Sequence, residues 1–309
     1  MSTRFHGLYA SVVCPMRRDG TVDEEAFTSH LRDVLGCPGM HGLLVNGHAG
    51  ENTLLTPEEM HRVVQLARAA AGRAPVVAGV AAEGSASAAA LSRDAADAGA
   101  DAIMVFAPFS WAMGVDPRVA LRHHQAIHDA TELPLFLFQG SVRSGGLHFP
   151  PALLRALVQL PRVVGIKEGS WDSAAYDLTR EVVTAERPGV AVMASGDEHL
   201  LACFAAGSAG SLVSLAAVVP ELIVALHRAV RAGDMTAARQ LHERVQPLAR
   251  AIYGAAPPGL ATPRLKACLH LLGRIPEATC RAPLPELDAE ERAVLRAAMT
   301  AAGVEGIMA

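Results

Sequence analysis

One lysine in this sequence stands where an amine could do chemistry. The 309 residues include 27 lysines and arginines, but only Lys167 and Lys266 are lysine. Lys167 directly follows the apolar run 163–166, where burial would lower the pKa of its amine to roughly 7–8. A neutral amine can form a Schiff base with a carbonyl substrate, and we predict this role for Lys167. The alternative is a lysine at a strand end whose amine reaches water.

Eight short apolar runs are typical of strands buried on both faces, as in a parallel sheet. Helical patterns separate them, for example over residues 23–36, 56–72 and 85–100. Eight such units predict a (β/α)8 TIM barrel, an α/β fold, whereas a doubly wound open sheet would not need eight evenly spaced units. The predicted strands are 8–13, 42–46, 75–80, 102–107, 133–138, 163–167, 190–195 and 210–215.

The last third of the chain has helical patterns only. We therefore expect residues 1–219 to form the barrel, completed by a helix at about 220–233. Residues 234–309 would then form a C-terminal helical extension. His123 and His124 lie in a helical stretch, and we expect them on a solvated face. The helical segments expected after the barrel are 220–234, 235–254, 262–273 and 288–302.

The carboxyl ends of the strands form the active-site face of such a barrel. Lys167 is the sharpest candidate among the residues that would stand there. The full set is Asn46, Gly47 and His48 after the second strand, Phe138 and Gln139 after the fifth, Lys167 and Glu168 after the sixth, Ser195, Gly196 and Asp197 after the seventh, and Ser214 after the eighth.

Four short motifs follow one another in a fixed order. They are GHAGE at 47–51, GIK at 165–167, ASGDEHLL at 194–201 and GSAGSLVS at 207–214. With this set the chain resembles the dihydrodipicolinate synthase/N-acetylneuraminate lyase family of class I aldolases. The resemblance covers essentially the whole chain and implies a barrel, a Schiff base on Lys167 and pyruvate or another 2-oxo acid as substrate. It also implies a homotetramer built as a dimer of dimers.

The chain departs from that family at three positions of its usual proton relay. Phe138 stands where the family has a tyrosine at the end of strand five, and phenylalanine has no proton to give. His48 and Ala49 replace the hydroxyl pair of the usual GTTGE or GSTGE loop. Ser110 and Trp111 occupy the region where the synthases have a second tyrosine. These departures disfavour lysine biosynthesis and an ordinary sialate lyase. We expect none of the three tyrosines at an active-face strand end: Tyr9, Tyr176 and Tyr253.

His48 is our candidate for the missing proton carrier, because an imidazole titrates near neutral pH. It could instead fill space or bond to the backbone. Arg143 lies at the offset where the synthases hold a second carboxylate, and a guanidinium suits bidentate binding. It could equally be an exposed loop residue. The other substrate contacts that the resemblance implies are Gly47, Ala49, Ser110, Phe138, Gly196 and Ser214.

Two charged residues are expected to serve the architecture. Glu51 ends the GHAGE loop and should hold it through backbone hydrogen bonds. Lys266 matches a family position on the C-terminal helix, away from the active site, where a structural or surface role is expected.

Several other classes are disfavoured. No metal-ligand spacing occurs and no GxGxxG follows a first strand, so we predict neither a metal nor any other cofactor. A net charge of −4 without a basic stripe argues against nucleic acid as a partner. No uncharged apolar run reaches 18 residues, which argues against a membrane span. Five scattered cysteines and a start without a signal-peptide layout are typical of a cytoplasmic protein.

Four functions remain open. The first is a Schiff-base lyase or aldolase acting on pyruvate or another 2-oxo acid through Lys167. The second is a dehydratase or deaminase that uses the same imine on a 2-oxo or cyclic imino substrate resembling a sugar acid. The third is a protein that binds a 2-oxo acid but no longer turns it over. The fourth is an enzyme with the same barrel that forms no imine.

Overall fold

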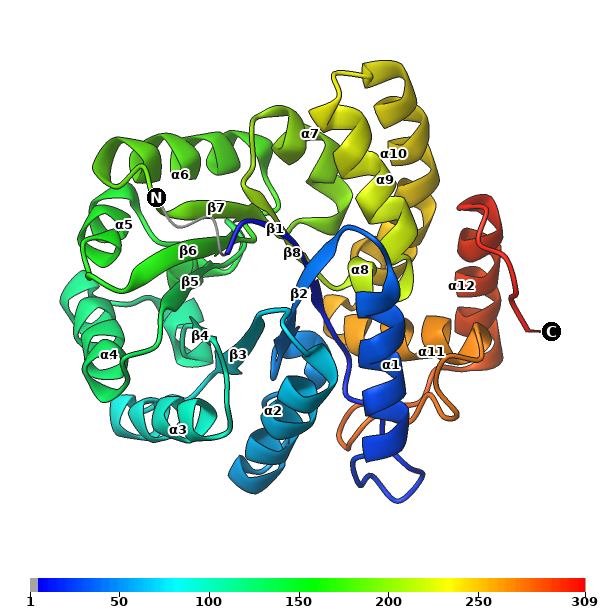
Figure 1. Cartoon of the computed structure of the whole chain (residues 1–309), viewed down its shortest axis with the longest axis horizontal. Coiled ribbons are helices and arrows are strands. Elements are labelled where there is room, and N and C mark those ends of the chain that lie inside the picture. The colour runs from blue at the N-terminus through cyan, green and yellow to red at the C-terminus, as the bar shows by residue number, and fades with distance from the viewer. Residues whose placement is uncertain (1–4, 309) are drawn as a thin grey trace.

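A closed barrel of eight parallel strands forms the centre of the molecule (Figure 1). This computed structural model describes residues 5–308. Each strand pairs with the next along the chain, and the last pairs with the first, so the predicted TIM barrel is confirmed. The strands are β1 (Gly7–Ser11), β2 (Met40–Val45), β3 (Val76–Val80), β4 (Ala102–Val105), β5 (Leu135–Gln139), β6 (Val163–Glu168), β7 (Ala191–Ala194) and β8 (Gly210–Val213).

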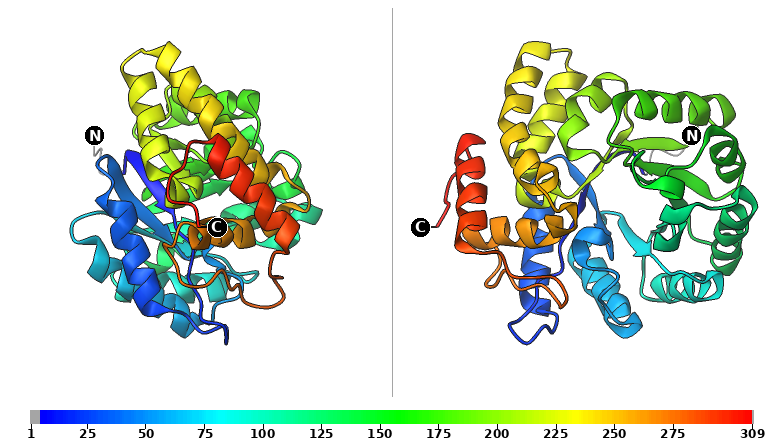
Figure 2. Two further views of the ribbon diagram at one scale, coloured as in Figure 1. Left: turned by 90° about the vertical axis from the view of Figure 1, so that its right-hand side faces the viewer. Right: turned by 180° about the vertical axis from the view of Figure 1, so that it is seen from behind.

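Helices connect the strands and cover the outside of the barrel (Figures 1 and 2). Several begin with strong caps, such as Thr56, which forms a capping box with Glu59 ahead of a proline in the first turn. The barrel helices are α1 (Glu24–Gly36), α2 (Pro57–Ala71), α3 (Ser85–Asp97), α4 (Pro117–Ala130), α5 (Pro151–Val158), α6 (Ser173–Glu186), α7 (Leu200–Ala205), α8 (Leu215–Val218) and α9 (Pro220–Arg231). Short 3-10 helices are η1 (His48–Gly50), η2 (Phe109–Met113), η3 (Gly145–Leu147), η4 (Asp197–His199) and η6 (Pro258–Leu260).

Three further α-helices follow and reach back to the barrel. They are α10 (Met235–Ala249), α11 (Ala261–Leu271) and α12 (Ala289–Ala301), with α12 outermost in Figure 2. The helix expected over 235–254 is present, but its last turn widens into the π-helix η5 (Arg250–Gly254). Because α11 packs against η1, the C-terminal segment lies beside the loop that follows β2.

Side chains along the strands alternate between the barrel interior and the shell of helices. Tyr9, Met104 and Phe136 belong to the apolar cluster inside the barrel, whereas Ile166 belongs to the cluster under the helices. Phe136 fits because the neighbouring strand has Gly165, where a Cβ would lie 2.3 Å from its ring. The residue after Ile166 is Lys167, so the alternation turns its side chain toward the interior.

The solvated face predicted for His123 and His124 is wrong. Both side chains are buried, with ring centroids 5.4 Å apart for Trp111 and His123 and 5.6 Å apart for His124 and Phe149. The His124 Nδ1 donates to the carbonyl of Ala120 at 2.8 Å, which lets the imidazole be buried. Burial lowers the pKa of His124 to about 4, so it packs as a neutral ring.

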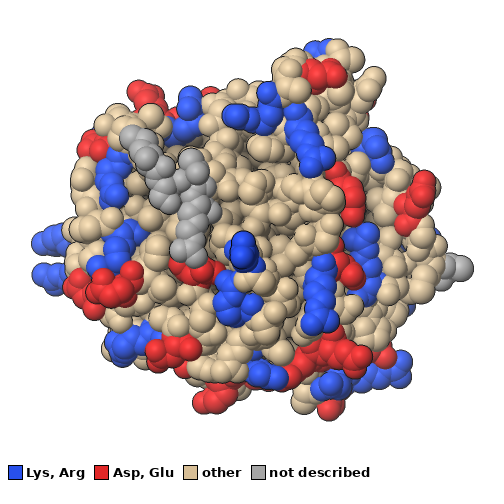
Figure 3. Space-filling model, in the orientation of Figure 1, with Lys and Arg blue, Asp and Glu red and all other residues tan. Residues whose placement is uncertain are grey.

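Charged side chains of both signs are interspersed over the face of the molecule shown in Figure 3. Within residues 5–308, none of the helices has the length and apolar character needed to cross a membrane.

Candidate active site

A cavity of about 170 Å³ opens at the carboxyl end of the barrel. Strand ends and the loops after them supply most of its wall, and the C-terminal extension supplies the rest. The wall is therefore complete only because α11 and η5 fold back over the barrel. Its lining residues are Ser11, His48, Ala49, Phe138, Lys167, Gly169, Trp171, Ser195, Asp197, Ser214, Tyr253, Ala261, Thr262 and Leu265.

Lys167 lines this cavity from the end of β6, and its side chain is 8% exposed. Burial lowers the pKa of its amine from 10.5 to about 8, while the nearby charge of Asp197 opposes that shift. The value agrees with the range expected from the sequence. Because one pH unit is a factor of ten, roughly a tenth of the amines are neutral at pH 7. Lys167 can therefore act as a nucleophile without a strong base.

Asp197 is the carboxyl group that acts on Lys167. It begins η4, just after β7, is 3% exposed, and its Oδ1 accepts a hydrogen bond from the Leu215 N–H at 2.9 Å. Burial raises the pKa of Asp197 to about 7, although the Leu215 bond and the charge of Lys167 both favour the carboxylate. Groups whose pKa values lie near 7 and 8 can donate and accept protons in the same pH range.

Aromatic rings lie against the amine. The Nζ of Lys167 is 5.7 Å from the centre of the Phe138 ring and 5.9 Å from that of Phe106. The two rings contact each other, with centroids 5.0 Å apart. A cation within about 6 Å of an aromatic face is stabilised by the ring quadrupole. Phe138 thus has no hydroxyl to offer but favours a positive charge on the Lys167 nitrogen.

His48 lies against the same rings, and its surroundings lower its pKa from the near-neutral value of a free imidazole. Its ring centroid is 4.3 Å from that of Phe106 and 5.8 Å from that of Phe138. The protein around the imidazole lowers the pKa of His48, and the charge of Lys167 adds to this effect. A hydrogen bond between Nδ1 and the Asn52 side chain opposes it. The ring keeps an exposed face, and water there offsets part of the shift. His48 is therefore mainly neutral at pH 7.

Glu51 holds the loop after β2 in place. It has left-handed backbone angles, with φ at 59°, which a side chain rarely adopts without support. The support is an ion pair with Lys266 and a hydrogen bond from the Arg281 N–H to Oε2 at 2.8 Å. Lys266 is fully buried and also donates to the Thr279 carbonyl at 2.8 Å. These contacts are those that an architectural role requires.

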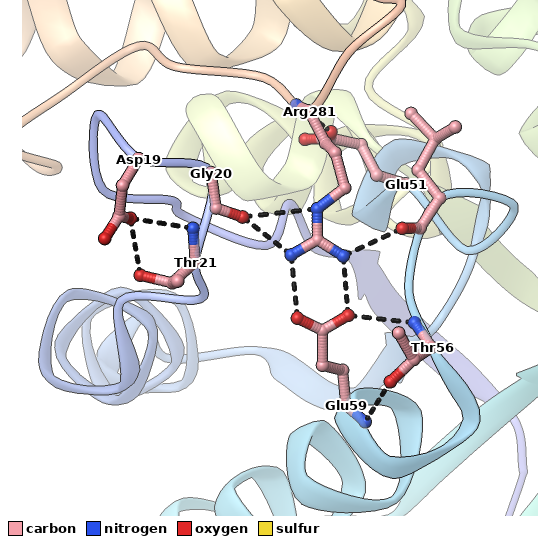
Figure 4. A network of polar contacts seen from close by, with 8 residues as sticks. Asp19, Gly20, Thr21, Glu51, Thr56, Glu59 and Arg281 are labelled. Carbon is pink, nitrogen blue, oxygen red and sulfur yellow. Dashed lines mark hydrogen bonds and ion pairs between the residues drawn. The ribbon is translucent and has the colours of Figure 1, made fainter.

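Arg281 extends this network across the chain, as Figure 4 shows. Its guanidinium forms two parallel bonds to the Glu59 carboxylate, at 2.5 and 2.7 Å, and donates to the Gly20 and Leu54 carbonyls. Bidentate pairs of this kind fix geometry as well as adding stability. The segment before α12 is thereby tied to the β1–α1 loop and to the start of α2.

The structure brings many of the expected site residues together. Gly47 and Gly196 stand beside cavity residues, and a Cβ at Gly47 would lie 3.2 Å from the Ser11 hydroxyl. The expected residues that line the cavity itself are His48, Ala49, Phe138, Lys167, Ser195, Asp197 and Ser214.

Arg143 and Ser110 do not line the cavity within this chain, and the substrate contacts expected of them stay a prediction. Both are exposed. The Ser110 hydroxyl donates to the Glu83 Oε2 at 2.5 Å, outside the cavity. Ser110 lies in η2 and Arg143 in the segment after β5. In such connections the distance of a residue from a motif along the sequence does not determine where its side chain points.

Sequence reasoning missed seven residues of the cavity wall, among them Tyr253, Thr262 and Trp171. Tyr253 comes from η5, and its ring centroid is 5.3 Å from that of Trp171 in the loop after β6. Thr262, at the start of α11, donates its hydroxyl to the His48 carbonyl at 3.2 Å. Trp171 could have been found, because it follows the GIK motif closely. No local pattern places Tyr253 or Thr262 at the mouth of the barrel.

No cluster of three or more His, Cys, Asp and Glu side chains in residues 5–308 is arranged to hold a metal ion.

Comparison with known proteins gives consistent matches over the whole chain. The model of the dihydrodipicolinate synthetase family matches residues 4–302. The 4-hydroxy-tetrahydrodipicolinate synthase of Acidiphilium cryptum is 33% identical over 303 residues, which cover 97% of this chain and 99% of that protein. The 4-hydroxy-tetrahydrodipicolinate synthase 1 of Streptomyces coelicolor is 35% identical over 299 residues, with coverages of 96% and 94%.

Solved structures show the same fold. YagE, a prophage protein of the dihydrodipicolinic acid synthase family from E. coli K12 in complex with pyruvate, has a TM-score of 0.89 at 25% identity, covering 97% and 99% of the two chains. The chloride-inhibited dihydrodipicolinate synthase of Acinetobacter baumannii, complexed with pyruvate, has a TM-score of 0.85 at 26% identity and the same coverages. A monomeric dihydrodipicolinate synthase variant has a TM-score of 0.88 at 25% identity, covering 98% of both.

Proposed function

The chain belongs to the dihydrodipicolinate synthetase family, and we propose that it is a Schiff-base lyase of the aldolase type acting on pyruvate or another 2-oxo acid. The observation that carries the proposal is the Lys167 amine. It is buried in a cavity of about 170 Å³, and its pKa is lowered to about 8. Pyruvate bound to two solved relatives supports a 2-oxo acid as the substrate.

The proposed reaction begins when the neutral Lys167 amine attacks the C2 carbonyl of the 2-oxo acid. The carbonyl oxygen leaves as water, and the product is a protonated imine. The imine nitrogen then accepts the electron pair of a bond at C3. When that bond is C–C, the substrate is cleaved, and when it is C–H, the enamine can add to an aldehyde. Phe138 and Phe106 stabilise the cationic imine through their ring faces.

The loop after β2 is the proposed site for the 2-oxo acid carboxylate. Gly47 and Ala49 have no bulky side chain there, and Glu51 fixes the loop from behind. Ser214 and the backbone at Gly196 border the same space from β8 and β7. His48, as a neutral ring, contacts the substrate and does not carry its protons.

Elimination of water or ammonia is the second candidate. Asp197 favours it, because a buried carboxyl with a pKa of about 7 can protonate a leaving hydroxyl or amine beside Lys167. The synthesis named for the curated relatives is disfavoured by Phe138 and by the exposed position of Arg143.

A homotetramer is part of the same proposal. It follows from the family resemblance, and the exposed apolar side chains Phe109 and Met113 on η2, 51% and 89% exposed, would be covered if that surface met a second subunit.

A panel of substrates tests the proposal. Hydroxylated 2-oxo acids would be supplied one by one, and release of pyruvate, water or ammonia would be measured in the wild type and in Lys167→Ala. We expect one class of product, absent in the variant. Release that persists in Lys167→Ala would contradict the proposal. If this protein instead forms 4-hydroxy-tetrahydrodipicolinate as fast as a known synthase does, its reaction is that of the curated relatives.

A further inference from the structure

We propose that the Tyr253 hydroxyl is the proton carrier of this site, in place of the strand-five tyrosine that the chain lacks. The proposal rests on the function proposed above, because it assigns a role in the same imine chemistry. It brings together a residue of the C-terminal extension and the barrel lysine, and no motif in the sequence connects them.

Tyr253 lines the same cavity as Lys167, Asp197 and Ser214. It alone among the tyrosines of the described chain does so. Tyr9 is fully enclosed in the apolar cluster inside the barrel, and Tyr176 is buried on α6. A phenol hydroxyl is therefore present at the site, but it comes from the C-terminal extension and not from the end of strand five.

The position of the Tyr253 ring is defined on two sides. Its ring packs against Trp171 with an interplanar angle of 48°, and Ser214 lines the cavity beside its hydroxyl, close enough to influence its pKa. The residue lies in the π-helix η5, and such single wide turns occur frequently at functional sites. Trp171 is itself held at a φ of 59°, a conformation that tryptophan rarely adopts without a packing reason.

The electrostatic surroundings keep the Tyr253 phenol neutral. Burial and the neighbouring charge of Asp197 raise the pKa of Tyr253 well above 10. The Ser214 side chain has a smaller effect in the opposite direction. A neutral phenol can donate one proton while it accepts another, so it moves protons without becoming charged. Asp197, with a pKa near 7, interacts with both Tyr253 and Lys167 and can store the proton between steps.

The proton steps balance with these groups alone. When the Lys167 amine adds to C2, nitrogen becomes positive and oxygen negative. The Tyr253 hydroxyl gives its proton to that oxygen and takes one from the nitrogen, which yields a neutral carbinolamine. Loss of the C2 hydroxyl as water requires one more proton, which the protonated Asp197 carboxyl supplies. A protonated imine then stands beside an Asp197 carboxylate.

The same two groups can form the enamine. The Asp197 carboxylate, through the Tyr253 hydroxyl, accepts a proton from C3, and the C–H electron pair moves into the imine. Reversal of this step in D2O returns a deuteron to C3. His48 cannot replace this path easily, since its pKa is lowered and its Nδ1 is 3.2 Å from the Asn52 Oδ1.

Exchange of the methyl protons of pyruvate in D2O, followed by proton NMR, tests the assignment. We expect Tyr253→Phe to lower the exchange rate by about 100-fold, the usual effect of losing an acid–base group. The matched control is Tyr176→Phe, which removes a buried hydroxyl outside the cavity and should change the rate less than about twofold. Borohydride trapping of the Lys167 imine in each sample shows that the site is assembled.

A rescue experiment separates a chemical role from a structural one. Phe138→Tyr, added to the Tyr253→Phe variant, places a phenol at the end of strand five. The double variant should exchange about ten times faster than Tyr253→Phe alone. Exchange at the wild-type rate in Tyr253→Phe would overturn the assignment. So would a double variant that stays at the level of Tyr253→Phe. A wild type that neither exchanges nor traps pyruvate or any other 2-oxo acid would instead refute the proposed function.

A second measurement does not depend on how well Tyr253→Phe folds. Incorporation of 3-fluorotyrosine acidifies every phenol without removing a contact, and only Tyr253 lines the cavity in the described chain. We expect the exchange rate to change, because a more acidic phenol gives up its proton more easily. An unchanged exchange rate would contradict the assignment.

Discussion

Phe138 of β5 is paired in register with Lys167 of β6, and the Lys167 Nζ lies 5.7 Å from the centre of the Phe138 ring. Phe138 is therefore the strand neighbour of the proposed nucleophile. It can stabilise a cation there but cannot move a proton. Charge stabilisation and proton transfer, which one tyrosine could combine, are separated in this chain between Phe138 and Tyr253.

Loss of the Phe138 ring should weaken the imine. Phe138→Leu removes the aromatic ring that stabilises the cation but keeps a side chain of similar volume. We expect trapping of the imine at a fixed pyruvate concentration to fall about fivefold. The measurement is the fraction of protein reduced by borohydride, read by mass spectrometry. Phe138→Tyr, which keeps the ring, is the control. Equal trapping in the leucine variant would show that the ring does not contribute.

The pH dependence should reflect Lys167 and Asp197 as a pair. The amine must be neutral, which favours pH above about 8, and the carboxyl must be protonated, which favours pH below about 7. The expected profile of kcat/KM is a bell with its maximum between these values. In Asp197→Asn the alkaline limb should disappear. The acid limb should move to lower pH, because the carboxylate no longer raises the pKa of Lys167. A profile unchanged by this substitution would contradict the pairing.

Replacing Lys167 should stabilise the fold. Its folded pKa of about 8 lies below the ordinary 10.5, so burying the charged amine costs stability in full below pH 8. Between pH 8 and 10.5 the unfolded chain binds more protons, and that cost disappears as pH rises. We expect Lys167→Met to gain about 1–3 kcal/mol at pH 7, from about 1.4 kcal/mol per pKa unit, and less at pH 10. Urea unfolding at both pH values measures the difference, and a loss at pH 7 would contradict the account.

Breaking the Lys266–Glu51 pair should have the opposite effect. Lys266→Met leaves the 3% exposed Glu51 carboxylate buried without its cation, and we expect a loss of about 3–5 kcal/mol of unfolding free energy. The matched control is Arg18→Ala, which breaks an exposed ion pair with Glu277 and should cost less than about 1 kcal/mol. Equal losses in the two variants would show that the buried pair does not hold the loop.

The barrel could be predicted because its strands are buried on both faces. Runs such as 163–166 lack the alternation of a half-exposed strand, and the structure places each of the eight runs in the sheet within a few residues. The position of Lys167 and the lowered pKa of its amine follow from that same burial. Both depend on one strand and its immediate neighbours, which is the range over which a sequence pattern is informative.

The other wall of the cavity could not be predicted, because distant segments build it. Tyr253 enters the site through the return of the chain over the barrel, and no periodicity encodes that return. The pKa of His48 depends on Phe106, which comes from the segment after β4. The exposed position of Arg143 could not be predicted for a related reason, since the direction of a loop side chain is set by the loop and not by its distance from a motif.

Borohydride trapping with pyruvate tests the central claim most directly. The chain contains only two lysines, so a peptide map distinguishes them without ambiguity. The account predicts that pyruvate becomes attached to Lys167 and that Lys266, fully buried and paired with Glu51, stays unmodified. Absence of any adduct with pyruvate and with a panel of other 2-oxo acids, in a folded protein, would contradict it. So would an adduct that persists in Lys167→Ala.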